Sequence, residues 1–176
     1  MPSPSDKPAV RAGLLAARRA LTEADRAEAD RLLVERAAAL ATGRRVAAYT
    51  PLAREPGGPD LVPALVRVAR QVILPVLRPD RDLDWTTAGG GGVLLGVAAI
   101  GTVDLVLVPA LAVDRLGVRL GRGGGSYDRA LARVAVTTPV VALLYPGELR
   151  ERLPVDPHDR RVTGAILPSG AVDTAA

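Results

Sequence analysis

The spacing of hydrophobic and polar residues changes once along the chain, near residue 43. Before that point, apolar residues recur every three or four positions, which is typical of amphipathic helices. We expect two helices in an N-terminal hairpin, the first capped by Ser5 or Asp6 and the second covering residues 23–40. Thr22 precedes the second helix in a pattern that resembles a capping box.

After residue 43 the apolar residues fall into short runs that do not alternate with polar ones. Such runs indicate strands buried on both faces, as in a parallel sheet covered by helices. The runs occupy residues 46–49, 72–76, 105–108 and 140–144. Helical patterns at 60–70 and 127–134 lie between them, so strands and helices alternate. We therefore predict an α/β fold, a mostly parallel central sheet flanked by helices, with the N-terminal helical hairpin added.

Length and composition are those of one ordinary globular domain. The chain has 176 residues, of which 48% are hydrophobic and 24% charged, which gives it enough apolar surface to bury. We expect a single domain over residues 1–176, with a flexible link at the glycine run 88–92 and a frayed tail after about residue 170. The sequence contains neither an uninterrupted run of about 18 apolar residues nor a signal-peptide pattern, so we expect a cytoplasmic protein.

Composition also narrows the chemistry. The absence of cysteine excludes a disulfide scaffold, a thiol nucleophile and a thiolate metal site, and His158 is the single histidine. The net charge is only +4, arginines alternate with acidic residues, and aromatic residues make up 2%. These features predict a solvated mixed surface and a monomer that acts on small molecules, with no nucleic-acid or membrane partner. An arginine-rich RNA-binding strip over residues 115–133 remains the alternative.

Residues 118–129 contain the strongest local pattern for chemistry. Glycines leave backbone N–H groups free to surround an anion, and four of them stand within five positions: Gly121, Gly123, Gly124 and Gly125. Arg119 and Arg122 add guanidinium groups that suit phosphate oxygens, and Asp128 can hold a magnesium ion shared with those phosphates. The alternative is a flexible surface loop in which Asp128 only caps the following helix.

This loop and several other segments together resemble the 5-formyltetrahydrofolate cyclo-ligase family, also called methenyltetrahydrofolate synthetases. The matching segments follow the family's order and are residues 7–11, 18–21, 46–51 with Glu55, 108–114, 117–125, 127–129 and 153–159. The resemblance implies an α/β enzyme that closes 5-formyltetrahydrofolate to 5,10-methenyltetrahydrofolate with MgATP, yielding ADP and phosphate. That reaction needs positioning and charge neutralisation rather than a protein nucleophile, which suits a chain without cysteine.

The resemblance also implies roles for individual residues. The ATP-binding positions are matched by Lys7, Arg11, Arg119, Gly121, Arg122, Gly123, Gly124, Gly125 and Tyr127. The magnesium positions are matched by Asp128 and Asp159, and the candidate catalytic residues are Arg122 and Asp128. The candidate folate-binding residues are Thr50, Glu55 and Trp85. Trp85 suits the hydrophobic core equally well, Asp159 suits a simple turn, and His158 is expected to shape that turn rather than act as a base.

The chain departs from the family pattern mainly on the folate side. Ser126 stands where the family usually has an aromatic residue. Residues 88–102 lack the usual glutamate-proline segment, which helps to form the family's folate pocket, and residues 166–169 lack a usual threonine-glutamate pair. The alternative function is therefore a catalytically impaired relative that binds nucleotide but has lost part of the folate pocket.

Overall fold

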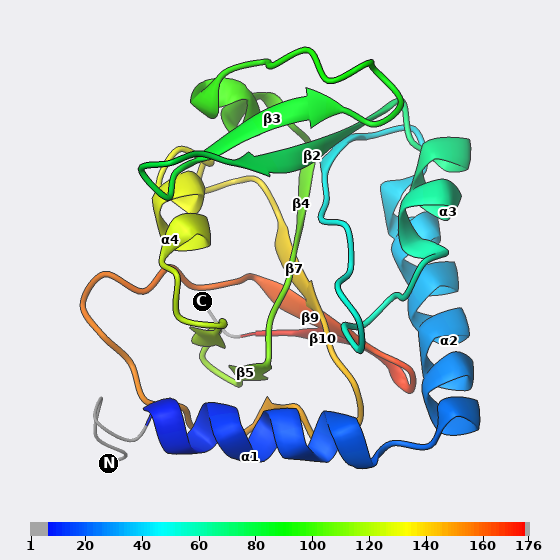
Figure 1. Ribbon diagram of the computed structural model, residues 1–176, viewed down its shortest axis with the longest axis vertical. Coiled ribbons are helices and arrows are strands. Elements are labelled where there is room, and N and C mark those ends of the chain that lie inside the picture. Colours follow the sequence, from blue (N-terminus) through cyan, green and yellow to red (C-terminus); the bar gives the residue numbers. More distant parts are fainter. Residues whose placement is uncertain (1–6, 175–176) are drawn as a thin grey trace.

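A seven-stranded sheet forms the centre of the protein in a computed structural model that describes residues 7–174 (Figure 1). The strand order is β10-β9-β7-β4-β1-β2-β3, in which the inner pairs are parallel and the two edge pairs are antiparallel. The strands are β1 (Arg45–Ala47), β2 (Gln71–Leu77), β3 (Leu83–Thr87), β4 (Leu105–Val108), β7 (Val140–Leu143), β9 (Gly164–Leu167) and β10 (Gly170–Asp173). The predicted α/β class with a mostly parallel sheet is confirmed.

Helices cover both faces of this sheet, which explains the apolar runs. Within β4, Val106 and Val108 pack into one core and Leu105 and Leu107 into the other, so every residue of the strand is buried. One face is covered by α2 (Glu23–Ala41) and α3 (Leu61–Val68), and the other by α4 (Ser126–Leu131) and the 3₁₀ helix η2 (Val97–Thr102). A strand in that position has no solvent face and needs no polar alternation.

The two N-terminal helices pack on different parts of the molecule rather than along each other. Figure 1 shows α1 (Lys7–Ala20) lying across one end of the fold, while α2 runs up the side of the main sheet. Leu14 of α1 packs against a small second sheet made of β6 (Arg119–Leu120), β5 (Ala112–Asp114) and β8 (Leu149–Arg150). Thr22 caps α2, since its side chain accepts from the Asp25 N–H. The expected caps Ser5 and Asp6 lie outside the described residues.

Three further details differ from or extend the sequence expectation. The tail expected to fray after about residue 170 forms β10, because the antiparallel pairing with β9 satisfies its backbone groups whatever its side chains. The glycine run at 88–92 forms turns after β3, with Gly89, Gly91 and Gly92 at positive φ. None of the helices within residues 7–174 is long and apolar enough to span a membrane.

Candidate functional site

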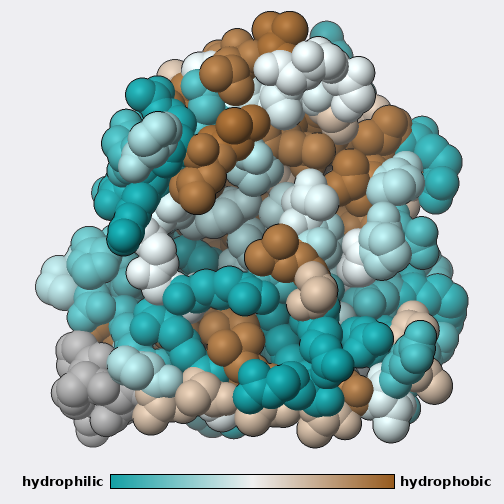
Figure 2. Space-filling model, viewed as in Figure 1, coloured by the Kyte–Doolittle hydropathy of each residue, from teal (hydrophilic) through white to brown (hydrophobic). Residues whose placement is uncertain are grey.

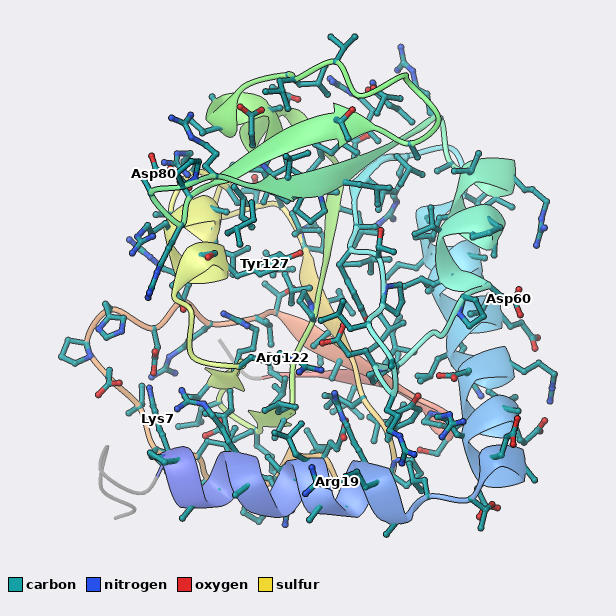
Figure 3. The ribbon with its side chains drawn as sticks, in the orientation of Figure 1. Lys7, Arg19, Asp60, Asp80, Arg122 and Tyr127 are labelled. Carbon is teal, nitrogen blue, oxygen red and sulfur yellow. The ribbon has the colours of Figure 1, made fainter. Side chains whose placement is uncertain are left out.

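A cavity of about 640 Å³ opens beyond the carboxyl ends of the parallel strands β1, β2 and β4. Ligands of open α/β sheets bind at this end, where loops from neighbouring strands meet. The walls come from the start of α1, the loops after β1 and β4, the glycine-rich loop before α4, and residues 156–159. Figure 3 shows three of these contributions, Lys7, Arg122 and Tyr127, around one central space.

The glycine-rich loop joins β6 to α4 along one wall of the cavity. Gly123 and Gly125 have φ values of 103° and 70°, in the left-handed region that favours glycine. A Cβ atom on Gly123 would lie 3.4 Å from the guanidinium carbon of Arg11. The Arg11 Nε in turn donates to the carbonyl oxygen of Gly121 at 2.9 Å. The first helix therefore holds the loop in place, and Gly123, Gly124 and Gly125 line the cavity with backbone alone.

Lys7 forms a buried ion cluster with two aspartates from the far end of the chain. Its Nζ lies 2.7 Å from Asp156 Oδ2 and 2.6 Å from Asp159 Oδ2. Burial alone would lower the pKa of Lys7, but the hydrogen bonds to both carboxylates outweigh burial and raise that pKa. The same contact lowers the pKa of Asp156. This corner of the cavity therefore combines an ammonium group with carboxylate oxygens.

Asp128 is held at the rim of the cavity by a buried arginine. Arg119, whose side chain is 5% exposed, donates from Nη2 to Asp128 Oδ1 at 3.2 Å and from Nη1 to the carbonyl oxygen of Pro109 at 3.1 Å. The backbone N–H of Arg160 donates to the same Asp128 oxygen at 3.1 Å. These contacts occupy Oδ1 and leave Oδ2 as the oxygen that a ligand can use. Arg119 is thus placed to orient Asp128.

Carboxylate oxygens at two points of the cavity suit a hard divalent cation. Asp128 offers Oδ2, and Asp159 offers Oδ1 because Lys7 and the backbone N–H of Asp156 both engage its Oδ2. Asp156, His158 and Asp159 also have possible ligand atoms within 4.8 Å of one another. Magnesium prefers oxygen ligands and keeps several waters, so the residues present fit this ion.

The opposite wall of the cavity is largely apolar. Leu52, Pro75, Leu77 and Leu83 line it, and Leu52 and Leu77 are 60% and 67% exposed. In Figure 2 the hydrophobic residues of this face gather in its upper half, over β2 and β3. Exposed leucines beside a cavity indicate a ligand with a flat or apolar part. Thr50, one of the candidate folate-binding residues, also lines the cavity.

Glu55 and Arg122 connect the two walls. Arg122 Nε donates to Glu55 Oε1 at 2.8 Å, and the backbone N–H of Leu52 donates to Glu55 Oε2 at 2.8 Å. The Glu55 side chain is 7% exposed, whereas that of Arg122 is 47% exposed. The carboxylate is therefore fixed at the cavity wall, while the arginine reaches toward it from the glycine-rich loop.

Tyr127 lines the cavity between these walls with an unpaired hydroxyl. Its Oη is buried and makes no hydrogen bond to any described residue, while Arg119 lies over its ring, 5.8 Å from the ring centre. Burial raises the pKa of Tyr127 well above its ordinary value, so the group stays a neutral O–H. A bound ligand can supply the missing partner.

The structure brings together most of the residues that the sequence predicted for the site. All nine ATP-binding candidates line the cavity, as do Thr50, Glu55, Asp128 and Asp159. Trp85 does not, which corrects the folate-binding expectation: it is 0% exposed on β3 and packs in the core with residues such as Ile73 and Leu131. On β3, Leu83 lines the cavity, whereas the Trp85 ring is enclosed by the core.

Two other features of the site were not foreseen. Residues 88–102, where the family's pocket segment is expected, are absent from the described residues that line the cavity. Asp156 was not singled out, although it stands in the same motif as Asp159 and binds Lys7. Its partner is 149 positions away in sequence, so only the fold reveals the contact.

Comparison with known proteins agrees with this geometry. The family model described as the 5-formyltetrahydrofolate cyclo-ligase family matches residues 3–168. A 5-formyltetrahydrofolate cyclo-ligase of Mycolicibacterium smegmatis is 37% identical over 189 residues, covering 97% of each chain. The structure of the Aquifex aeolicus 5,10-methenyltetrahydrofolate synthetase superposes with a TM-score of 0.78 at 26% identity, covering 97% of this chain and 94% of that one. The Mycoplasma pneumoniae synthetase has the same fold, with a TM-score of 0.77 at 23% identity over 92% and 98% of the two chains.

Proposed function

The chain belongs to the 5-formyltetrahydrofolate cyclo-ligase family, and from that premise we propose that it closes 5-formyltetrahydrofolate to 5,10-methenyltetrahydrofolate at the expense of ATP. The formyl oxygen takes the γ-phosphoryl group as the bond to ADP breaks. The N10 nitrogen of the folate then attacks the activated formyl carbon and loses its proton, and the carbon–oxygen bond breaks to release phosphate, which can take up that proton. A new carbon–nitrogen bond is formed, so the activity is that of an ATP-dependent ligase.

The observation that carries this proposal is the pairing of two unlike walls in one cavity. The glycine-rich loop, Lys7, Arg11 and Arg122 present backbone N–H groups and cations, which suit the phosphates of ATP. The wall with Leu52 and Leu77 suits the flat rings of a folate. Both reactants can therefore meet within one enclosure, which supplies the positioning that the reaction needs.

Glu55 and Arg122 are the groups we assign to the reacting ends of the two substrates. The fixed Glu55 carboxylate can accept hydrogen bonds from the amino and N–H donors of the pterin ring. Arg122 stands beside it and can neutralise charge on the transferring phosphoryl group. We propose Arg122 and Asp128 as the catalytic residues.

Asp128 and Asp159 are the residues that would hold Mg²⁺. Each is anchored through one oxygen by a cation or a backbone N–H, which leaves its other oxygen for the ion or its waters. When bound, the magnesium neutralises phosphate charge during phosphoryl transfer. Arg119 and Lys7 orient these carboxylates through their hydrogen bonds.

The impaired nucleotide-binding relative is less well supported than the active enzyme. That alternative rests on the missing glutamate-proline segment at residues 88–102. The cavity nevertheless has an apolar wall and a fixed carboxylate. Ser126 lines the cavity where an aromatic residue is usual, and the exposed Leu52 and Leu77 line it as well. We propose that the enzyme acts in the cytoplasm as a monomer on these small molecules.

The test is the ultraviolet absorbance of purified protein mixed with 5-formyltetrahydrofolate and MgATP. We expect the methenyl product to accumulate only when both ATP and magnesium are present, and reactions lacking one of them are the controls. Folded protein that binds ATP but forms no product would favour the nucleotide-binding relative. Product formed without ATP would refute the proposed chemistry.

A further inference from the structure

Behind the cavity, a second set of polar side chains holds the loop that carries Glu55. Tyr145 lies two residues after the end of β7 and is 1% exposed, and Asp30 comes from the middle of α2. Neither belongs to the described residues that line the cavity. The Tyr145 hydroxyl donates to Asp30 Oδ1 at 2.8 Å and lies 3.2 Å from the carbonyl oxygen of Glu55. The backbone N–H of Gly57 donates to the same Asp30 oxygen at 2.8 Å.

Tyr145 is itself fixed by Glu148 and Arg18. Its backbone N–H donates to Glu148 Oε2 at 2.9 Å, and Arg18 lies over its ring, 5.6 Å from the ring centre. Arg18 and Glu148 form a buried bidentate pair, with distances of 2.6 and 2.9 Å. Arg18 also donates to the carbonyl oxygen of Ala110 at 2.6 Å. The tyrosine hydroxyl is therefore a rigid point, tied to α1 and to the end of the sheet.

The loop that it holds has a conformation that would not persist alone. Arg54, next to Glu55, has φ of 65°, a left-handed conformation uncommon for a residue with a side chain. A Cβ atom on Gly58 would lie 3.0 Å from Asp30 Oδ2, so the loop also presses closely on α2. Backbone strain of this kind persists only where surrounding contacts determine the geometry, and here those contacts include Tyr145 and Asp30.

We propose that Tyr145 and Asp30 are positioning residues that set the place of the Glu55 carboxylate, and through it the affinity for the folate substrate. The inference rests on the proposed function, in which Glu55 accepts hydrogen bonds from the pterin ring. The hydroxyl and the aspartate touch no substrate. They fix the backbone of residues 55–57, and that backbone sets the position of the carboxylate.

The first test replaces Tyr145 by phenylalanine, which removes the hydroxyl and keeps the ring under Arg18. We expect the KM for 5-formyltetrahydrofolate to rise about tenfold, the effect of one lost hydrogen bond, while the KM for ATP stays unchanged. The matched control is Thr174→Val, which removes another buried hydroxyl, one that donates to the Val162 carbonyl oxygen at 2.7 Å. We expect the control to lower thermal stability without changing either KM.

A double-mutant cycle separates positioning through Glu55 from a general loss of stability. In a Glu55→Ala background, Tyr145→Phe should add nothing to the KM for folate, because the carboxylate that it positions is gone. A further rise in that background would overturn the proposal, as would an equal rise of both KM values in Tyr145→Phe alone. If Glu55→Ala itself leaves the folate KM unchanged, the failure lies with the proposed role of Glu55.

Asp30 gives an independent test with a rescue. Asp30→Ala removes the oxygen that binds both Tyr145 and Gly57, and we expect the same selective rise in the KM for folate. Asp30→Asn keeps a carbonyl oxygen that can accept both hydrogen bonds, so it should restore most of the affinity. Equal KM values for folate in the wild type and Asp30→Ala, with intact far-ultraviolet circular dichroism, would refute the positioning role.

Discussion

The two walls of the cavity are built by different means. The wall that we propose for phosphate, called the phosphate wall below, contains ion pairs: Lys7 with Asp159, which are far apart in sequence, and Arg119 with Asp128, which flank the glycine-rich loop. The wall that we propose for folate, called the folate wall below, is largely apolar and carries one carboxylate, that of Glu55, which binds Arg122 and the backbone N–H of Leu52. The first wall holds its charged groups in fixed positions without a ligand, and the second provides an apolar surface for a ligand to pack against. Charge substitutions should therefore act on turnover, whereas changes on the apolar wall should act on folate affinity alone.

The largest effect is expected at Asp128 in the phosphate wall. Asp128→Asn keeps an oxygen for Arg119 and for the backbone N–H of Arg160, so the fold should be preserved. It removes the negative charge that a magnesium ion requires, and we expect kcat to fall roughly a thousandfold. Steady-state turnover with MgATP measures this fall, and circular dichroism checks the fold. Turnover within tenfold of the wild type in the folded variant would show that Asp128 is dispensable.

Arg122 lies where the two walls meet, so its replacement should affect the KM values for both substrates. Arg122→Ala removes the partner of Glu55 and the candidate phosphate ligand together. We expect kcat to fall about a hundredfold and the KM values for both substrates to rise. Arg122→Lys keeps the charge but loses the planar fork, and should recover part of kcat. A change confined to one substrate would assign Arg122 to a single wall.

The phosphate wall was also the part of the site that local sequence predicted best. Glycines and arginines of residues 119–125 are adjacent in the chain, so their chemistry is visible in one segment. Asp156 escaped notice because its partner Lys7 lies at the other end of the chain. The sequence alone does not distinguish a tryptophan that packs in the core from one that stacks on a ligand. The burial of Trp85 in the structure does.

The strands differ in the same way: some are predicted by their own sequence pattern, and others depend on pairing with a neighbouring strand. The four apolar runs correspond to β1, β2, β4 and β7, because a strand buried on both faces is recognisable as a short continuous apolar run. The strand β3 was missed because its sequence, LDWTT, includes polar residues and an aspartate, and its conformation depends on pairing with β2. The strands of the small sheet have two or three residues, too few for any period to show.

A smaller and more selective effect is expected on the folate wall. Leu77→Ala removes an exposed apolar contact from the cavity, worth about 1 kcal/mol when a ligand covers it, which is a roughly fivefold rise in the KM for folate. The KM for ATP and kcat should stay unchanged. Val136→Ala truncates an apolar residue that is 98% exposed and not part of the cavity wall, and serves as the control. An equal effect of Leu77→Ala on both substrates would contradict the separation of the walls.

The smallest effect concerns the pH dependence of stability in the Lys7 cluster. The hydrogen bond from Lys7 lowers the pKa of Asp156 below its unfolded value of about 4, so its contribution to stability is present above that pH and is lost as pH falls through the lowered pKa. The pKa of Lys7 is raised despite burial, so its contribution is present below about 10.4 and is lost as pH rises through the raised value. The cluster should stabilise the fold most between these limits.

Urea unfolding of the wild type and Asp156→Asn at pH 7 and near pH 2 tests this window. We expect the variant to have the lower urea midpoint at pH 7 and the two midpoints to converge at the acidic pH. Glu28→Gln breaks an exposed pair with Arg31, whose side chains are 60% and 58% exposed, and is the matched control. Added salt should remove the change in urea midpoint caused by Glu28→Gln. It should leave most of the change caused by Asp156→Asn, because the side chain of its partner Lys7 is only 9% exposed. If salt instead removes the pH 7 difference in urea midpoint from both variants alike, that outcome contradicts the prediction, because the Lys7 cluster then behaves like an exposed surface ion pair.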